Sequence, residues 1–184
     1  MESSALNLAT WIRGRFEDSS LTHLKLQKLV FYCFVAGLAL DHEAELGAIR
    51  FEAWQHGPVN RDVWNRFRNV KAAPLPLLGP ELAPRYSAAL EEVLTDTLTV
   101  YGALDAWSLR QQTHLEQPWV DAYATRSEIE PATLRDHFRS KFRCDVRAPQ
   151  YLAHSWNDTL DGLPTATFSS LRELAAAVSS MRAA

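Results

Sequence analysis

Residues 22–40 form the segment that most constrains how this chain can fold. Its apolar side chains recur at the i, i+3, i+4, i+7 spacing of one helical face: Leu26, Leu29, Val30, Cys33, Phe34, Gly37 and Leu38. A second apolar stripe consists of Leu24, Phe31 and Val35. Because little of such a helix can face water, we predict that it forms the centre of the protein core.

The same periodicity predicts further helices on both sides of this segment. They are expected over residues 5–16, 85–100 and 104–113, from Pro118, from Pro131, and from Ser169 or Ser170 onward. The helix over 104–113 rests on the apolar residues Leu104, Trp107 and Leu109. Four prolines and a glycine within residues 72–84 predict an irregular connector.

Residues 48–67 combine a strand pattern with a helix signal. Over residues 48–55 apolar and polar side chains alternate, which predicts a short strand. Gly57 and Pro58 then predict the start of a helix, because the missing N–H of proline costs nothing at the first helical position. Val59, Val63 and Phe67 would form the inward face of that helix.

The composition indicates one globular domain. The chain has 184 residues, of which 47% are hydrophobic and 22% charged. A domain of this length buries roughly two-thirds of its unfolded surface, so it needs no disulfide or metal. We therefore predict a mainly α, compact helical domain over residues 1–145 with one or two short β-strands. Residues 146–184 are expected to form a C-terminal helical extension packed on the same domain.

Charge and cysteine content argue against several classes of partner. A net charge of −3 does not by itself imply a nucleic-acid or membrane partner. The first residues lack the pattern of a signal peptide, and no stretch approaches the roughly 20 apolar residues of a membrane span. Cys33 and Cys144 show no CxxC spacing, as expected of buried thiols in a reducing compartment. We expect a cytoplasmic protein without a membrane partner.

The sequence lacks the motifs of common catalytic and cofactor sites. Its six histidines form no HxxxH pair, and His114-x-Glu116 is the nearest arrangement to a metal-ligand pair. There is no GxSxG nucleophile elbow and no glycine-rich phosphate loop. Cys33 lies beside Phe31 and Phe34, whose apolar side chains are expected to raise its pKa. We therefore predict a binding protein with no catalytic residue, metal or cofactor.

The chain has more tryptophan than is usual for its length, and this excess tells more about function than the absent catalytic motifs do. Of six tryptophans, Trp54, Trp64, Trp107 and Trp119 fall near the junctions marked by glycine and proline. Each can be a core residue whose indole N–H binds a backbone carbonyl. Alternatively, each can belong to an interface, where tryptophan and arginine often dominate the binding energy.

Two clusters of basic residues are the other candidates for a binding surface. The first contains Arg61, Arg66, Arg68 and Lys71, and the second Arg135, Arg139, Lys141, Arg143 and Arg147. Either cluster can be a solvated face. Otherwise it can contact an acidic protein surface or a phosphate backbone.

Three blocks of the sequence together resemble one family. They are LTHLKLQKLVFYCFVAGLAL over residues 21–40, FEAWQHGPVNRDVW over 51–64 and YGALDAWSLRQQTHLEQPWVDA over 101–122. Their order and spacing are similar to those of the phage-associated Panacea domain, also known as the SocA-like or GepA-like domain. The resemblance covers about residues 5–125.

The resemblance implies a function that composition and periodicity do not. Such bacterial proteins are encoded beside a toxin and neutralise it, usually by direct binding, and a SocA-type member instead delivers its toxin to the ClpXP protease. We expect an antitoxin that binds a cognate protein toxin. The alternatives are an adaptor for a ClpXP-type protease, or a nucleic-acid-binding regulator that uses residues 135–147. The residues expected to bind the toxin are Trp54, His56, Arg61, Trp64, Trp119, Arg135 and Arg139.

Overall fold

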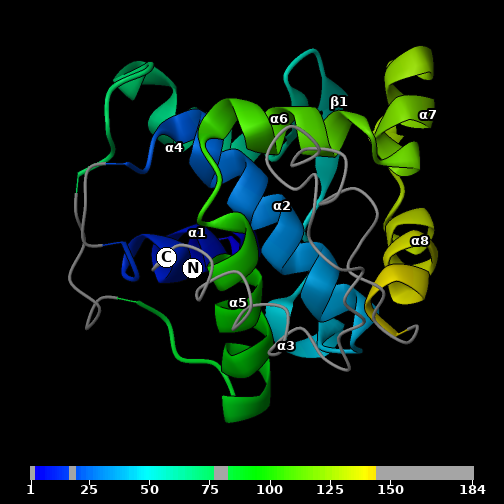
Figure 1. The fold of residues 1–184 in the computed structure, drawn as a ribbon, viewed down its shortest axis with the longest axis horizontal. Helices are drawn as coiled ribbons and strands as arrows, with labels where there is room; N and C mark the ends of the chain where they lie inside the picture. The colour runs from blue at the N-terminus through cyan, green and yellow to red at the C-terminus, as the bar shows by residue number, and fades with distance from the viewer. Residues whose placement is uncertain (1–2, 17–19, 77–82, 144–184) are drawn as a thin grey trace, which may run out of the picture.

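Helix α2 (His23–Ala39) crosses the middle of the molecule in the computed structural model (Figure 1). The structure describes residues 3–16, 20–76 and 83–143. The Thr22 side chain caps α2 by accepting the Lys25 N–H. Every residue of α2 except Leu24 is buried, so the predicted central helix is confirmed.

Shorter helices pack around α2, which contacts α1, α5, α6 and α8 along its length. Within the described residues they are α1 (Ser4–Arg13), α3 (Glu43–Leu46), α4 (Arg61–Phe67), α5 (Ala88–Tyr101), α6 (Ala106–His114), α7 (Gln117–Thr125) and α8 (Pro131–Arg143). A 3-10 turn, η1 (Arg68–Val70), follows α4. The mainly α class is thus confirmed. The predicted helix after Ser169 or Ser170 and the extension over 146–184 lie outside the described residues.

Three short strands form an antiparallel sheet that packs against the middle of α2. The strands β1 (Phe51–Trp54), β2 (Gly57–Val59) and β3 (Glu128–Ile129) are arranged in the order β2-β1-β3. Glu52 is opposite Val59 on one side of β1 and opposite Glu128 on the other. The strands β1 and β2 therefore form a hairpin, which projects between α6 and α7 in Figure 1.

The predicted helix start at Gly57 and Pro58 is wrong. Gly57 has a φ of 94°, which closes the hairpin turn, and Pro58 pairs with Ala53 in the sheet. The helix begins only at Arg61, where Asn60 is the N-cap. The inward positions Val63 and Phe67 are buried as predicted.

Aromatic rings fill the space between α2 and its neighbours. The Phe31 ring contacts Phe51 of β1 at 5.2 Å and Phe138 of α8 at 5.8 Å between centroids. Tyr32 stacks on Tyr101 of α5 at 3.9 Å. One α2 turn thus binds the sheet, α5 and α8 into one core.

Trp107 is an exception to the predicted inward faces. Its side chain is 61% exposed, whereas Leu109, Gln112 and Thr113 of the same helix are buried. Leu109 follows Trp107 by two positions, a rotation of about 200° around the helix, which places the two side chains on opposite faces. Trp107 therefore belongs to the surface.

Candidate protein-interaction surface

Two buried polar residues of α2 hold the hairpin in place. The Gln27 side chain donates to Asn60 O at 3.1 Å and accepts the Asn60 N–H at 3.0 Å. The Lys28 ammonium donates to Pro58 O at 2.8 Å. These bonds explain why polar residues occupy an otherwise apolar helix: they satisfy the backbone of the strand that packs against it.

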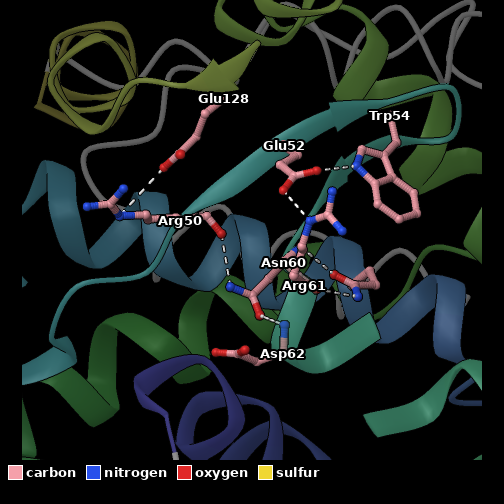
Figure 2. A network of polar contacts seen from close by, with 8 residues as sticks. Arg50, Glu52, Trp54, Asn60, Arg61, Asp62 and Glu128 are labelled. Carbon is pink, nitrogen blue, oxygen red and sulfur yellow. Dashed lines mark hydrogen bonds and ion pairs between the residues drawn. The ribbon is translucent and has the colours of Figure 1, made fainter. Parts of the chain in front are cut away.

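Asn60 extends this anchor to the next helix. Its side-chain amide donates to Arg50 O at 2.9 Å, and its Oδ1 accepts the N–H groups of Asp62 and Val63 (Figure 2). The buried Asn60 side chain therefore joins the segment before β1 to the start of α4. The orientation of α4 relative to the hairpin is fixed as a result.

The contact between Lys28 and the hairpin leaves little free space. A Cβ atom at Gly57 would lie 2.5 Å from Thr113 Oγ1 and 2.8 Å from Lys28 Nζ. Complete burial lowers the pKa of Lys28 to about 7, with a further contribution from the charge of Arg110. A charged ammonium in this position is costly, and the Pro58 carbonyl compensates for part of that cost.

On the outer side of the hairpin, four residues form what we call the α4 cluster: Trp54, Arg61, Trp64 and Arg68. The two indole rings meet edge to face at 5.4 Å. The Arg61 guanidinium lies 5.7 Å from the Trp54 ring, and that of Arg68 lies 5.1 Å from the Trp64 ring. Such cation–π contacts hold long side chains in place at an exposed site.

Glu52 fixes the α4 cluster to β1. Its carboxylate accepts the Trp54 indole N–H at 2.8 Å and forms an ion pair with Arg61 (Figure 2). The hydrogen bond from Arg61 is the largest cause that lowers the pKa of Glu52. Trp54 and Arg61 are thus preorganised before any partner binds.

A second group, the α6 cluster, lies at the hairpin turn and consists of His56, Trp107 and Arg110. The His56 ring meets the Trp107 ring edge to face at 6.1 Å. Arg110 donates from Nε to His56 Nδ1 at 3.2 Å, and its guanidinium lies 5.6 Å from the Trp107 ring. We refer to the α4 and α6 clusters together as the hairpin surface.

Trp119 lies beneath the hairpin surface. It is 6% exposed, and its indole N–H donates to Trp54 O at 3.3 Å. Its ring stacks on His114 at 4.0 Å and on Tyr123 at 4.7 Å. Trp119 therefore supports the hairpin from α7, and of the four tryptophans singled out it is the one that is buried.

The arrangement offers no metal site within the described part of the chain. Burial, followed by the charge of Arg110, lowers the pKa of His114 to about 4, so its ring is neutral at pH 7. The buried carboxylate of Glu116 pairs with His137 at 2.8 Å and with Lys141. No group of three potential ligand residues could hold a metal ion among the described residues. Burial also raises the pKa of the Cys33 thiol, as the sequence predicted.

The structure brings together five of the seven residues expected to bind the toxin. Trp54, His56, Arg61 and Trp64 are on the hairpin surface, and Trp119 lies below it. Arg135 and Arg139 are instead on α8, where they pair with Glu43 and Asp41. These contacts link α8 to the segment after α2 and do not reach the hairpin.

Three residues of the hairpin surface are absent from the seven expected to bind the toxin: Arg68 and Trp107, which the sequence offered only as general interface candidates, and Arg110, which it did not single out. Arg68 follows Trp64 by four positions, and Arg110 follows Trp107 by three. Those spacings bring side chains together on one helical face. Tryptophan followed by arginine at helical spacing is therefore the sequence signal that could have identified Arg110 and paired Arg68 with Trp64.

The fold and the hairpin surface define a mainly helical domain in which three surface tryptophans, one of them largely exposed, each lie against an arginine. A family described as "Antitoxin SocA-like, Panacea domain" matches residues 26–120, from the first turn of α2 to the first turn of α7. The chain belongs to this family. The comparisons with curated proteins and with solved structures found no match. In the part of the chain that the structure describes, no helix has the length and hydrophobicity needed to cross a membrane.

Proposed function

We propose that this protein is an antitoxin that neutralises a cognate protein toxin by binding it directly through the hairpin surface. The observation that carries the proposal is the exposed side chain of Trp107 together with its arginine and histidine neighbours. Tryptophan and arginine are enriched among the residues that contribute most to protein–protein affinity. Family membership supports a toxin as the partner.

The rigidity of the surface also supports direct binding. The hairpin is bound to α2 by Gln27 and Lys28, to α4 by Asn60 and to α7 by Trp119. A surface that is ordered before binding loses less conformational entropy when the complex forms. The buried polar groups of this region serve the structure, which favours a binding role over catalysis.

Replacing Trp107 with alanine tests the proposal. We expect the affinity for the toxin encoded by the adjacent gene to fall at least tenfold, as is typical of an interface tryptophan. The fold should be unaffected, because the side chain is exposed. The measurements are calorimetric titration with purified, inactivated toxin and rescue of growth in cells that express the active toxin.

Leu115→Ala provides the matched control. Leu115 is 58% exposed and lies at the end of α6, outside the hairpin surface. Its replacement should change the affinity less than twofold. Neutralisation without a stable complex, accompanied by loss of the toxin from cells, would contradict direct masking and favour delivery to a protease.

A further inference from the structure

A groove of about 710 Å³ shares Trp107 with the hairpin surface. Its walls come from three places in the chain: the segment leading into α2, the residues after η1, and the connection from α5 to α6. Trp107 therefore lines the groove and also contacts His56 and Arg110. A partner that covers Trp107 also reaches the groove.

The side chains that line the groove leave room for a polypeptide backbone. Four of the lining residues have no side chain larger than a methyl group: Ala72, Gly102, Ala103 and Ala106. Small residues allow a bound backbone to approach closely. Leu104 and the rings of Phe16 and Trp107 supply apolar contacts in the same groove. These features fit an extended segment with at least one apolar side chain.

The charges around the groove favour an acidic occupant. Lys25 and Lys71 line it, and Arg110 contacts Trp107. No carboxylate among the described residues forms an ion pair with Lys71 or Arg110. The acidic residue of the lining is Asp105, whose carboxylate accepts the N–H groups of Trp107 and Ser108 at 2.8 Å each and interacts with the charge of Lys25. Lys25 and Asp105 therefore offset each other, and Lys71 is the excess positive charge of the lining.

Three other arginines named above differ from these cations. Arg61, Arg135 and Arg139 each pair with a carboxylate of the same chain. A partner would have to displace those carboxylates before it could use the arginines. Arg110 lies beside the groove at Trp107 and donates to His56 and to the Gln55 carbonyl, so no carboxylate in the part of the chain that the structure describes offsets its charge. Lys71 and Arg110 are thus the better contacts for carboxylates of another protein.

We propose that the groove receives an extended acidic segment of the toxin, which lies against Trp107 and places its carboxylates near Lys71 and Arg110. This inference rests on the proposed function, namely that the chain binds its toxin directly. It goes further by naming the chemistry of the segment that is bound. The hairpin surface would anchor the toxin, and the groove would select for negative charge.

Reversing the charge of Lys71 tests the groove separately from the hairpin surface. The probe is the purified, inactivated toxin encoded by the adjacent gene. We expect Lys71→Glu to weaken its binding about fivefold at low salt, with a smaller effect at high salt because exposed charges are screened. Arg85→Glu is the control. Arg85 is an exposed arginine just before α5, and it does not line the groove, which α5 approaches only at its other end.

A photo-crosslinking residue in place of Ala106 identifies the occupant. The toxin peptide that is captured should carry a net negative charge. Equal affinity of wild type and Lys71→Glu, or capture of a neutral or basic peptide, would overturn the groove assignment while the wild-type chain still binds toxin. If the wild-type chain does not bind the toxin at all, the proposed function fails and the groove assignment fails with it.

Discussion

At the scale of single residues, Lys28 links the core to the candidate binding surface. Its stem lies in α2, the most buried helix among the described residues, and its ammonium donates to the Pro58 carbonyl of the hairpin. A sequence pattern identifies the helix but gives no partner for a lysine within it. The partner is 30 residues away, and only the folded chain brings the two together.

The buried lysine makes stability depend on pH. Its pKa falls from 10.5 to about 7 on folding, so between those values the unfolded chain holds a proton that the folded chain has released. The free energy of unfolding should therefore rise with pH in this window, by on the order of 2 kcal/mol between pH 7 and 9. Below pH 7 both states hold the proton and the effect is constant.

Lys28→Met should remove most of this rise, because methionine fills a similar volume and does not titrate. Urea denaturation at pH 7 and pH 9 measures it. Lys71→Met is the control: this lysine is exposed and should keep the wild-type difference between the two pH values. An unchanged pH dependence in Lys28→Met would show that another group causes it.

At the scale of elements, the hairpin is the part that sequence patterns describe least well. Periodicity predicted α2, α5, α6 and α8, because a helix that packs on one face repeats its apolar positions within a few residues. It failed for β2, where Gly57 and Pro58 resemble a helix start. There the positive φ of Gly57 and the contact with Lys28 decide the structure. The strand β3 has two residues, too few to show any alternation.

Gly57→Ala should destabilise the hairpin. The glycine has a φ of 94°, and an added Cβ would come within 3 Å of both Thr113 Oγ1 and Lys28 Nζ. We expect a loss of about 1 to 3 kcal/mol in the free energy of unfolding, measured by urea denaturation. Gly14→Ala, at a φ of −66°, should change it by less than 1 kcal/mol. Equal effects of the two substitutions would contradict this account of the turn.

At the scale of the whole molecule, two surfaces rich in arginine have different surroundings. The three arginines of the hairpin surface each lie against a tryptophan ring, and one of them, Arg61, also pairs with Glu52 of β1, whereas those of α8 pair with carboxylates near the end of α2. Composition and spacing made both surfaces candidates for binding. What distinguishes the two surfaces is which acidic residues the fold brings close to each arginine. Glu43 and Asp41 are 92 and 98 positions away in sequence from Arg135 and Arg139, so the sequence alone does not show these pairs.

Reversing the charge of Arg135 and Arg139 together shows whether these arginines attach α8 to the domain or bind the toxin. If these arginines attach α8 to the domain, the double substitution to glutamate should lower the free energy of unfolding by on the order of 1 to 2 kcal/mol. Each exposed ion pair that is lost contributes about 0 to 1 kcal/mol, and the new glutamates face Glu43 and Asp41 as like charges. Affinity for the toxin should change less than twofold. Urea denaturation and calorimetric titration measure the two effects.

The same double substitution tests the remaining alternative of nucleic-acid binding. A nucleic-acid-binding regulator would bind duplex or single strands with an affinity that falls steeply with salt, and the double substitution would abolish that binding. We expect no such binding by wild type, because both guanidinium groups already pair with carboxylates of the chain. A tenfold loss of toxin affinity with unchanged stability would instead move the interface to α8. If the double substitution lowers the free energy of unfolding and leaves the toxin affinity unchanged, Arg135 and Arg139 attach α8 to the domain, and recognition of the toxin belongs to the arginines of the hairpin surface.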